Sequence, residues 1–424
     1  MKQVKGLRWW IISLIGLATV INYVDRSSLA VMWPDISKDL SLSKEDYAGI
    51  LTFFMVAYAI GQGVSGRLFD KVGTRIGFVL SIVVWSMACA MHGLARNLAS
   101  FGGFRALLGL SEAGNWPGAT KANAEWFPIK ERALAQGIFN AGASLGAVIS
   151  APLIAVLYSL LGWQATFVVI GALGIIWVFP WWYLNRSDPN QHPWITAEER
   201  EYILKGQKPA ETVRAEDQAL SVGEILSHKQ SWSVLVSRFF LDPIWWMFVN
   251  WLPIYLAEQF GFDIKQIGLF AWVPYVGAAA GSLSGGWWSG HLIHNGWTVN
   301  KARKLAIIVG GVVMLPSMIL CAYASTPLAA VLLIAAVLFG FQFVINNLQT
   351  LPSDFFAGKS VGTLAGLGGM TAVGGIILFS TWLVPTLTRT SYVPFFMMGA
   401  LLVPVGILSV FLLAGRIERV QIQK

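Results

Sequence analysis

Residues 9–33 read WWIISLIGLATVINYVDRSSLAVMW, an apolar run that contains two adjacent and opposite charges, Asp25 and Arg26. A helix of ~20 apolar residues covers the ~30 Å of hydrocarbon in a bilayer, so this run predicts a transmembrane helix. Asp25 then lies ~24 Å along the helix from Trp9, past the midpoint of the membrane. Ionisable side chains at that depth are energetically costly, and the default interpretation is a functional site.

The two charges cannot readily neutralise each other. Neighbouring residues of an α-helix point ~100° apart, so Asp25 and Arg26 face different directions. Each is therefore predicted to find a partner elsewhere in the chain. The alternative is a local Asp–Arg pair without a functional role.

The composition is that of a polytopic membrane protein. Of the 424 residues, 55% are apolar and 12% are charged, against about 25% charged residues in soluble domains. The first apolar run is too long for a signal-peptide core and has no small-residue cleavage site before Asp25, so it is predicted to remain as a helix. Cys89 and Cys321 stand in separate apolar runs without ligand spacing, and neither a disulfide framework nor a metal site is predicted.

Apolar runs of membrane-spanning length recur along the whole chain in two groups of six. They lie at about 9–33, 47–66, 76–95, 99–120, 133–159, 163–184, 231–257, 267–290, 304–323, 327–352, 361–386 and 391–414. This pattern predicts an all-α membrane protein of twelve transmembrane helices in two six-helix bundles, residues 1–184 and 231–424. Lys and Arg concentrate in alternate connecting segments, which places both termini in the cytoplasm. The net charge of +8 is thus explained by topology, and no nucleic-acid partner is predicted.

Residues 185–230 are predicted to form a cytoplasmic linker with short helices. Thr196 with Glu199, and Ser221 with Glu224, have the spacing of capping boxes that begin helices. Residues 206–219 between them are polar and predicted to be flexible. A linker of this size is too small for a catalytic domain, and it joins two similar halves. Transporters are often built from such repeats, with the substrate site at the repeat interface.

The segment between the second and third runs reads GRLFDKVGTR, residues 66–75. It resembles the signature loop of major facilitator transporters, and the resemblance implies a gating role for Gly66, Asp70 and Arg75. Glycine permits close helix approach, and the Asp70 carboxylate can bond the end of a neighbouring helix. An ordinary basic loop would explain the charges but not this spacing. The equivalent segment of the second half has Gly290 at the Asp position, so the pattern does not support a second latch there.

The fourth run adds two more charges, Arg105 and Glu112. They are seven residues apart, so they share one helix face and lie ~10 Å from each other. This helix is expected to run from outside to inside, which places Arg105 at the depth of Asp25 and Arg26. Four charges are thus predicted to converge. The alternative is a self-neutralising structural quartet, although apolar packing would do the same work without burying ions.

The combination of Tyr23, Asp25, Arg26, Tyr58, Arg105 and Glu112 resembles, at the same spacings, proton-coupled sugar-acid symporters of the anion:cation symporter family. Further stretches, among them FNAG at 139–142, resemble its hexuronate-transporter branch. The resemblance implies that Arg26 and Arg105 hold the substrate carboxylate and that Asp25 and Glu112 carry protons. It also implies that Tyr23, Tyr58 and Asn140 contribute to the substrate site.

Two later runs carry polar side chains that are unusual in a membrane span. Arg238 and Asp242 in the seventh run have the i, i+4 spacing of an ion pair, and Trp246 and Asn250 follow on nearly the same stripe. They either steady the helix or read substrate hydroxyls. The tenth run has four amides, which either bind sugar hydroxyls or join helices: Gln342, Asn346, Asn347 and Gln349. Where the hexuronate branch has a His and a Trp–Ser pair, this chain has Phe341, Val344 and Ile345, so the exact sugar stays open.

The sequence as a whole predicts a monomeric, multi-pass protein of the bacterial inner membrane that imports a small sugar-acid anion together with protons. A hexuronate, galacturonate or glucuronate, is the predicted substrate, and no cofactor or metal is predicted. Alternatives are a uniporter or exchanger of another organic acid such as an aldonate or aldarate, and a membrane sensor or enzyme. The last would require a catalytic cluster or a soluble domain, which the sequence lacks.

Overall fold

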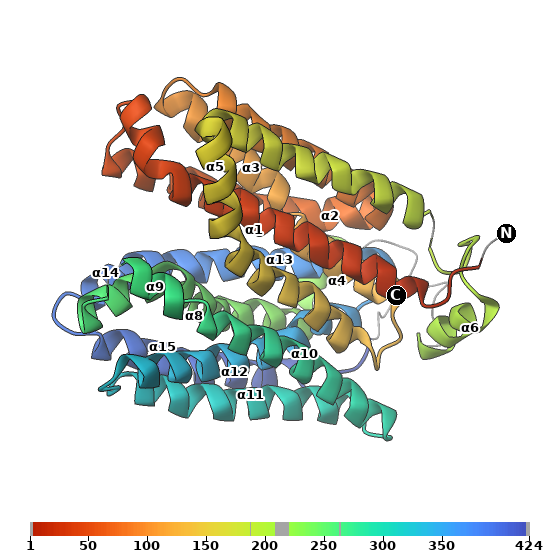
Figure 1. The fold of residues 1–424 in the computed structure, drawn as a ribbon. Coiled ribbons are helices and arrows are strands. Elements are labelled where there is room, and N and C mark those ends of the chain that lie inside the picture. The colour runs from red at the N-terminus through yellow and green to blue at the C-terminus, as the bar shows by residue number, and fades with distance from the viewer. Residues whose placement is uncertain (1–2, 187, 208–219, 263, 421–424) are drawn as a thin grey trace. The chain divides into compact units, whose positions relative to one another are not determined.

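The computed structural model describes residues 3–186, 188–207, 220–262 and 264–420. These residues are predominantly helical and contain no strand, only an isolated bridge between Val4 and Ile195. The prediction of an all-α protein is confirmed. The longer helices are α1 (Leu7–Asp39), α2 (Lys44–Met91), α3 (Leu98–Glu112), α4 (Asn115–Trp126), α5 (Arg132–Leu184), α8 (Lys229–Phe260), α10 (Val273–His294), α11 (Val299–Cys321), α12 (Pro327–Phe355), α13 (Val361–Gly375) and α15 (Val393–Ala414) (Figure 1). The shorter ones are η1 (His92–Leu94), α6 (Ala197–Gly206), α7 (Val222–Ser227), α9 (Ile264–Phe270), η2 (Gly358–Ser360), the π-helical η3 (Ile376–Leu383) and α14 (Val384–Leu387).

Seven helical stretches of the described chain are long and apolar enough to cross a membrane. Two of them exceed one crossing, because α2 has 48 residues and α5 has 53. These lengths correspond to ~72 and ~80 Å of helix against ~30 Å of hydrocarbon. Each is interrupted by one glycine with positive φ, Gly73 (φ 78°, ψ 166°) and Gly162 (φ 74°, ψ 172°). This backbone region is essentially restricted to glycine, so the sequence itself sets both breaks.

The predicted connection at residues 66–75 is wrong in its extent. Helical conformation continues through residues 66–72, and only Gly73 leaves it. The end of an apolar run indicates where the bilayer ends, not where the helix ends. Arg67 and Lys71 are good helix formers, so the helix continues into water. The predicted fourth run is likewise divided between α3 and α4, with turn residues Ala113 and Gly114 between them.

The chain divides into two compact units. Unit 1 comprises Met1–Pro128, Gly142–Ala219 and Gly358–Met370, and unit 2 comprises Ile129–Ala141, Leu220–Ala357 and Thr371–Lys424. In unit 1, Phe78 of α2 contacts Trp181 of α5 with ring centroids 4.8 Å apart. In unit 2, α10 lies beside α12, and α8 packs on α15 through Phe248 and Phe395 (Figure 1). The predicted two-bundle division at residues 184 and 231 stays a prediction.

The linker helices begin as their caps predict, with one exception. Ser221 and Glu224 form the complete capping box of α7. Thr196 caps α6, but the Glu199 carboxylate does not return to it as predicted. Its Oε2 accepts the backbone N–H of Leu7 at 3.0 Å and its Oε1 accepts from Nη1 of Arg8 at 2.7 Å, so it neutralises the N-terminus of α1 instead. Most of the segment predicted to be flexible, 208–219, lies outside the described residues.

Candidate functional site

Two charged side chains form an ion pair inside unit 1. Arg26 lies on α1 and Glu112 ends α3, and Nε of Arg26 lies 2.7 Å from Oε2 of Glu112. The Glu112 side chain is fully buried and that of Arg26 is 10% exposed. Burying either charge alone would be strongly unfavourable, so each depends on the other. The structure thus brings together two residues that the sequence separates by 86 positions.

The other two predicted charges lie beside this pair. Arg105 precedes Glu112 by two helical turns on α3, and its Nη2 donates to the backbone carbonyl of Arg26 at 2.9 Å. Asp25 is fully buried on α1. The charged groups that act on its carboxyl group are Glu112, Arg105 and Arg26. The four charges of the sequence prediction therefore form one cluster, in which only Arg26 and Glu112 are in ion-pair contact among the described residues.

Aromatic rings surround the Arg26 guanidinium on its remaining sides. Its central carbon lies 4.5 Å from the ring centroid of Tyr58 and 5.7 Å from that of Tyr23. Phe54 and Trp116 add rings at 5.4 and 5.5 Å. Cation–π contacts contribute most where the cation is desolvated, so this cage stabilises a charge that water cannot reach freely. The sequence analysis did not assign Phe54 or Trp116 to the site, although Phe54 precedes Tyr58 by one helical turn.

Several polar atoms of the cluster have no hydrogen-bond partner within the described chain. On the arginines these atoms are Nη2 of Arg26 and Nε and Nη1 of Arg105. On the acids they are Oε1 of Glu112 and both carboxyl oxygens of Asp25. Buried N–H groups without acceptors are rare in proteins. Two planar guanidinium groups with unused donors can hold one carboxylate, because their fork geometry matches its two oxygens.

The predicted gating residues Gly66 and Asp70 lie where α2 meets the N-terminus of α13. Oδ1 of Asp70 accepts from the backbone N–H of Gly362 at 3.0 Å, and Oδ2 accepts from the N–H and Oγ1 of Thr363 at 2.6 and 2.7 Å. A Cβ on Gly66 would lie 2.1 Å from the carbonyl oxygen of Gly362, so only glycine permits this approach. The carboxylate thus satisfies the free N–H groups of a helix start, where negative charge is favourable.

Lys121 completes the Asp70 contact, and sequence analysis missed it. Its Nζ lies 3.1 Å from Oδ1 of Asp70 and donates to the carbonyl of Gly358, also at 3.1 Å. Lys121 is nearly fully buried, which a basic residue tolerates only with an anionic partner. Arg75, the third predicted gating residue, stacks on Trp182 of α5, 3.9 Å from the ring centroid, and its gating role stays a prediction.

In unit 2, predicted substrate amides join three helices. Nδ2 of Asn140 on α5 donates to Oδ1 of Asn346 on α12 at 2.6 Å and to Oε1 of Gln349 at 2.7 Å. Asn346 in turn donates from Nδ2 to the carbonyl of Ser282 on α10 at 2.6 Å. Gln136 donates to Gln349 at 2.8 Å. Of the two alternatives for the amides of α12, the contacts of Asn346 favour helix joining.

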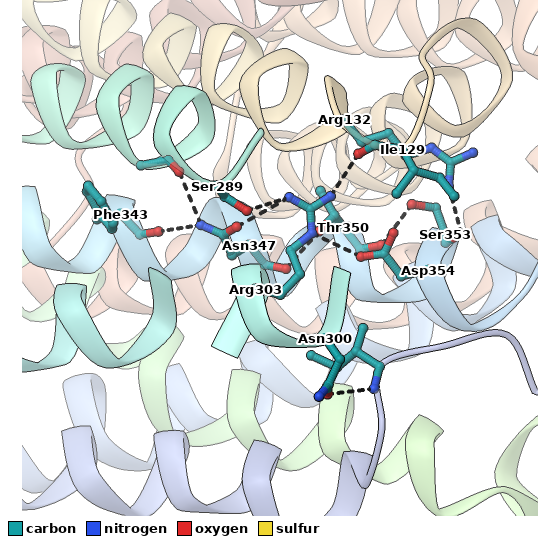
Figure 2. A network of polar contacts seen from close by, with 12 residues as sticks. Ile129, Arg132, Ser289, Asn300, Arg303, Phe343, Asn347, Thr350, Ser353 and Asp354 are labelled. Carbon is teal, nitrogen blue, oxygen red and sulfur yellow. Dashed lines mark hydrogen bonds and ion pairs between the residues drawn. The ribbon is translucent and has the colours of Figure 1, made fainter. Parts of the chain in front are cut away.

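Asn347 belongs to a second network, which is built around a buried arginine (Figure 2). Arg303 of α11 is fully buried and donates to Oδ2 of Asp354 at 3.1 Å, to Oγ of Ser289 at 2.9 Å and to the carbonyl of Ile129 at 3.1 Å. Its Nη1 also lies 3.4 Å from Oδ1 of Asn347. In the sequence Arg303 stands just before an apolar run, and nothing in its spacing indicates that it is buried.

The remaining predicted residues of unit 2 have fewer polar contacts. Arg238 and Asp242 form the predicted i, i+4 ion pair at 2.7 Å, and Oδ1 of Asp242 has no hydrogen-bond partner among the described residues. Oε1 of Gln342 is also buried without one. Asn250 is exposed and lies 3.4 Å from Oγ of Ser380, and Trp246 is partly buried. Asp242 and Gln342 thus keep unused acceptors.

A family model described as the Major Facilitator Superfamily matches residues 15–380. The chain belongs to the major facilitator superfamily. Among its relatives, the hexuronate transporter of Escherichia coli strain K12 is 35% identical over 90% of this chain and 88% of its own length. The galacturonate transporter of Dickeya chrysanthemi is 34% identical over 74% of this chain and 91% of its own. The D-galactonate transporter of Escherichia coli O6:H1 is 28% identical, with 97% of both chains covered.

The solved structures agree on the fold of this superfamily member. The crystal structure of the human organic anion transporter MFSD10 matches with a TM-score of 0.71, at 15% sequence identity, and covers 96% of this chain and 100% of the other. Membership of the superfamily and the apolar helices make this a multi-pass membrane protein. It belongs with transporters rather than enzymes.

Proposed function

We propose that this superfamily member is a symporter that imports a small sugar acid, a hexuronate such as galacturonate or glucuronate, together with protons. The observation that carries the proposal is the buried pair of guanidinium groups on α1 and α3, Arg26 and Arg105, which keep donor atoms without a hydrogen-bond partner within the described chain. The relatives named as hexuronate and galacturonate transporters support the substrate class.

In this proposal the substrate carboxylate competes with Glu112 for Arg26. When the substrate binds both arginines, Glu112 loses the charge that neutralises it and takes up a proton, because a buried carboxylate without a counter-charge is unfavourable. When the substrate leaves on the other side, Arg26 pairs with Glu112 again and the proton departs. Asp25 is proposed as a second proton carrier, which exchanges its proton in each cycle if more than one proton accompanies the substrate. Tyr23 and Tyr58 form walls of the site.

The residues of unit 2 have two proposed roles. Four residues are proposed to contact substrate hydroxyl groups: Asp242, Trp246, Asn250 and Gln342. Amide and carboxylate oxygens accept hydrogen bonds from hydroxyl groups, and the indole N–H of tryptophan donates to them. Asn140, Asn346 and Asn347 are proposed to act on the substrate through the helices that they hold. Gly66 and Asp70 are proposed to take part in gating through α13.

The proposal includes a membrane arrangement. Twelve spans follow if α2 and α5 each cross twice, with breaks at Gly73 and Gly162, and if α3 with α4, α9 with α10, and α13 with η3 and α14 each cross once. An even number of spans places both termini on one side, and the distribution of Lys and Arg assigns that side to the cytoplasm. The relatives from Escherichia coli support the bacterial inner membrane as the location. The protein is proposed to act as a monomer.

A second candidate is a uniporter or anion exchanger for an aldonate or aldarate. It is favoured by relatives named as a D-galactonate transporter and a probable galactarate/D-glucarate transporter, the latter 32% identical. The same arginines would bind these substrates without proton coupling.

Uptake by the purified protein in proteoliposomes separates the two candidates. Labelled galacturonate, glucuronate, galactonate and galactarate are offered with and without an imposed pH gradient, acidic outside. We expect galacturonate or glucuronate to accumulate only when the gradient is present. Accumulation of galactonate in preference to both uronates would overturn the substrate, and uronate uptake that does not respond to the gradient would overturn the proton coupling.

A further inference from the structure

A pocket of about 670 Å³ lies on unit 1 where α5 ends and α2 resumes after its break. It is lined by two arginines and four apolar or aromatic residues: Arg75, Phe179, Pro180, Trp182, Tyr183 and Arg186. The pocket is separate from the buried Arg26–Glu112 cluster, and the proposed transport cycle does not use it.

Both arginines are held in place without a carboxylate partner. Arg75 stacks on Trp182 at 3.9 Å and donates to the carbonyl oxygens of Arg186 and Trp182 at 3.0 and 3.3 Å. Arg186 lies over the rings of Tyr183 and Trp194 at 5.3 and 4.5 Å. Within the described chain neither guanidinium lies within 4.0 Å of an acidic oxygen. Two fixed positive charges therefore face one pocket, and an anion is its natural complement.

Two exposed apolar stripes lead from the membrane span to these charges. On α2, Ile76 comes directly after Arg75, and Leu80 and Val84 follow Ile76 at intervals of four residues; all three are exposed. On α5, Ile176, Phe179 and Tyr183 form a second exposed stripe at intervals of three and four, with Phe179 71% exposed. Residues at these intervals share one helix face. Trp181 of α5 joins the two helices, because its Nε1 donates to the backbone carbonyl of Arg75 on α2 at 3.1 Å.

The position of the pocket on the helices identifies its ligand. The apolar part of α5 ends at Leu184, and the following residues, among them Asn185, Arg186 and Asp188, are polar. Exposed Trp and Tyr at such an end mark the level of lipid headgroups. A soluble anion would need the arginines only, whereas the stripes offer surface for acyl chains. We infer that this pocket binds the phosphate of an anionic glycerophospholipid, with Arg75 and Arg186 on the headgroup and the two stripes under its acyl chains.

Native mass spectrometry of the purified full chain tests this assignment. The protein in detergent is titrated with dioleoyl phosphatidylglycerol or with phosphatidylcholine of the same chains, which keeps the phosphate but has no net charge. We expect tighter binding of phosphatidylglycerol. Arg75→Gln and Arg186→Gln should each weaken it about fivefold, the share of one basic residue near an anionic surface, and binding of phosphatidylcholine should not change.

Arg416→Gln is the matched control, since Arg416 is an exposed arginine just beyond the end of α15 in unit 2. We expect it to bind phosphatidylglycerol like the wild type. Wild-type affinity in the Arg75→Gln, Arg186→Gln double variant would overturn the proposal. Displacement of the lipid by inorganic phosphate at millimolar concentration would also overturn it, because the site would then bind free anions. Should Arg75→Gln fail to fold, Arg186→Gln tests the proposal alone, because its side chain lies on the surface.

Discussion

One carboxylate and four aromatic rings surround Arg26, and this arrangement lets the guanidinium exchange one anionic partner for another. The rings stabilise the guanidinium by up to about 2 kcal/mol each where it is desolvated, and they remain in place whichever anion is bound. Glu112 supplies the one ion-pair contact of Arg26 within the described chain, at 2.7 Å. An incoming carboxylate therefore needs to replace one partner rather than rebuild the site.

Arg105→Lys should keep the charge of the cluster and lose most transport. Arg105 uses Nη2 on the carbonyl of Arg26 and has Nε and Nη1 left over. A lysine ammonium is a point charge that cannot hold the carbonyl and present a planar fork to the substrate. Loss of one charged hydrogen bond amounts to about 1.5–3 kcal/mol, so the apparent affinity for galacturonate should fall about 10- to 150-fold in proteoliposome uptake.

The matched control for this variant is Arg96→Lys, a change to an exposed arginine just before α3. It should leave uptake unchanged. Near-normal affinity in Arg105→Lys would show that Arg105 is structural or only attracts the anion electrostatically.

Glu112→Gln should separate substrate binding from proton coupling. Glutamine has the shape of the protonated acid, so Arg26 stays available to the substrate at all times. We expect the variant to exchange internal for external labelled substrate at a rate near that of the wild type, but not to accumulate it under a pH gradient. Glu201→Gln, a change on the exposed surface of α6, serves as the control. Undiminished accumulation in Glu112→Gln would leave Asp25 alone as the coupling residue.

The sequence could indicate the charged residues of the site, but not the residues that surround them. Asp25, Arg26, Arg105 and Glu112 stand out because charges are rare in apolar runs. Phe54 and Trp116 do not stand out, because aromatic residues are common in membrane spans and only the packing of α2 and α4 beside α1 brings their rings to Arg26. The partners of Asp70 could not be foreseen either, since Thr363 lies 293 residues away along the chain.

At the scale of elements, glycines set how closely helices approach. Gly66→Ala places a Cβ 2.1 Å from the carbonyl oxygen of Gly362, which is backbone and cannot yield without moving α13. Overpacking of this kind typically costs 1–3 kcal/mol. We therefore expect a fall of a few degrees in the apparent melting temperature in detergent. Gly49→Ala on the same helix has no heavy atom within 4 Å of its added Cβ and should leave it unchanged or slightly raised. Equal melting temperatures for both variants would contradict the close contact.

The amides of α12 should divide into two classes. Asn346→Ala removes the donor to the Ser282 carbonyl and the acceptor of Asn140, and buried groups left unpaired cost about 1–3 kcal/mol. It should lower the melting temperature. Gln342→Ala removes an amide whose oxygen has no partner in the described chain, so it should leave the melting temperature unchanged and weaken galacturonate affinity about 5- to 20-fold. The reverse outcome would exchange the two roles.

Helix positions could be predicted from apolar runs because burial in lipid requires a nearly continuous apolar surface. Helix ends could not, since α2 continues through residues 66–72, where charged residues already interrupt the apolar run. Glycines at 277, 281 and 285 repeat every fourth residue, a spacing typical of close helix packing, and added Cβ atoms there would all lie within 2.7 Å of α12 backbone atoms. The network of Arg303 arises from the ends of α10, α11 and α12 together, and no single run contains it (Figure 2).

For the molecule as a whole, the transport proposal implies a constant charge in the Arg26 cluster. Without substrate, two arginines and the ionised Glu112 give a net charge of one, if Asp25 keeps its proton. With a bound monoanion and a protonated Glu112 the net charge is again one. The carrier would then reorient with the same charge, loaded or empty, and each substrate anion would be accompanied by one proton.

Such a cycle is electroneutral, and the membrane potential tests it. A monoanion that entered alone would be opposed by about 2.3 kcal/mol at 100 mV, inside negative, which reduces its accumulation about 50-fold. We expect galacturonate accumulation driven by a fixed pH gradient to be the same with and without a potassium diffusion potential set by valinomycin. Collapse of the pH gradient by nigericin should abolish accumulation and serves as the control. A fall in accumulation at negative potential would indicate uniport. A rise would indicate more than one proton per substrate, in which case Asp25 also releases and takes up a proton in each cycle.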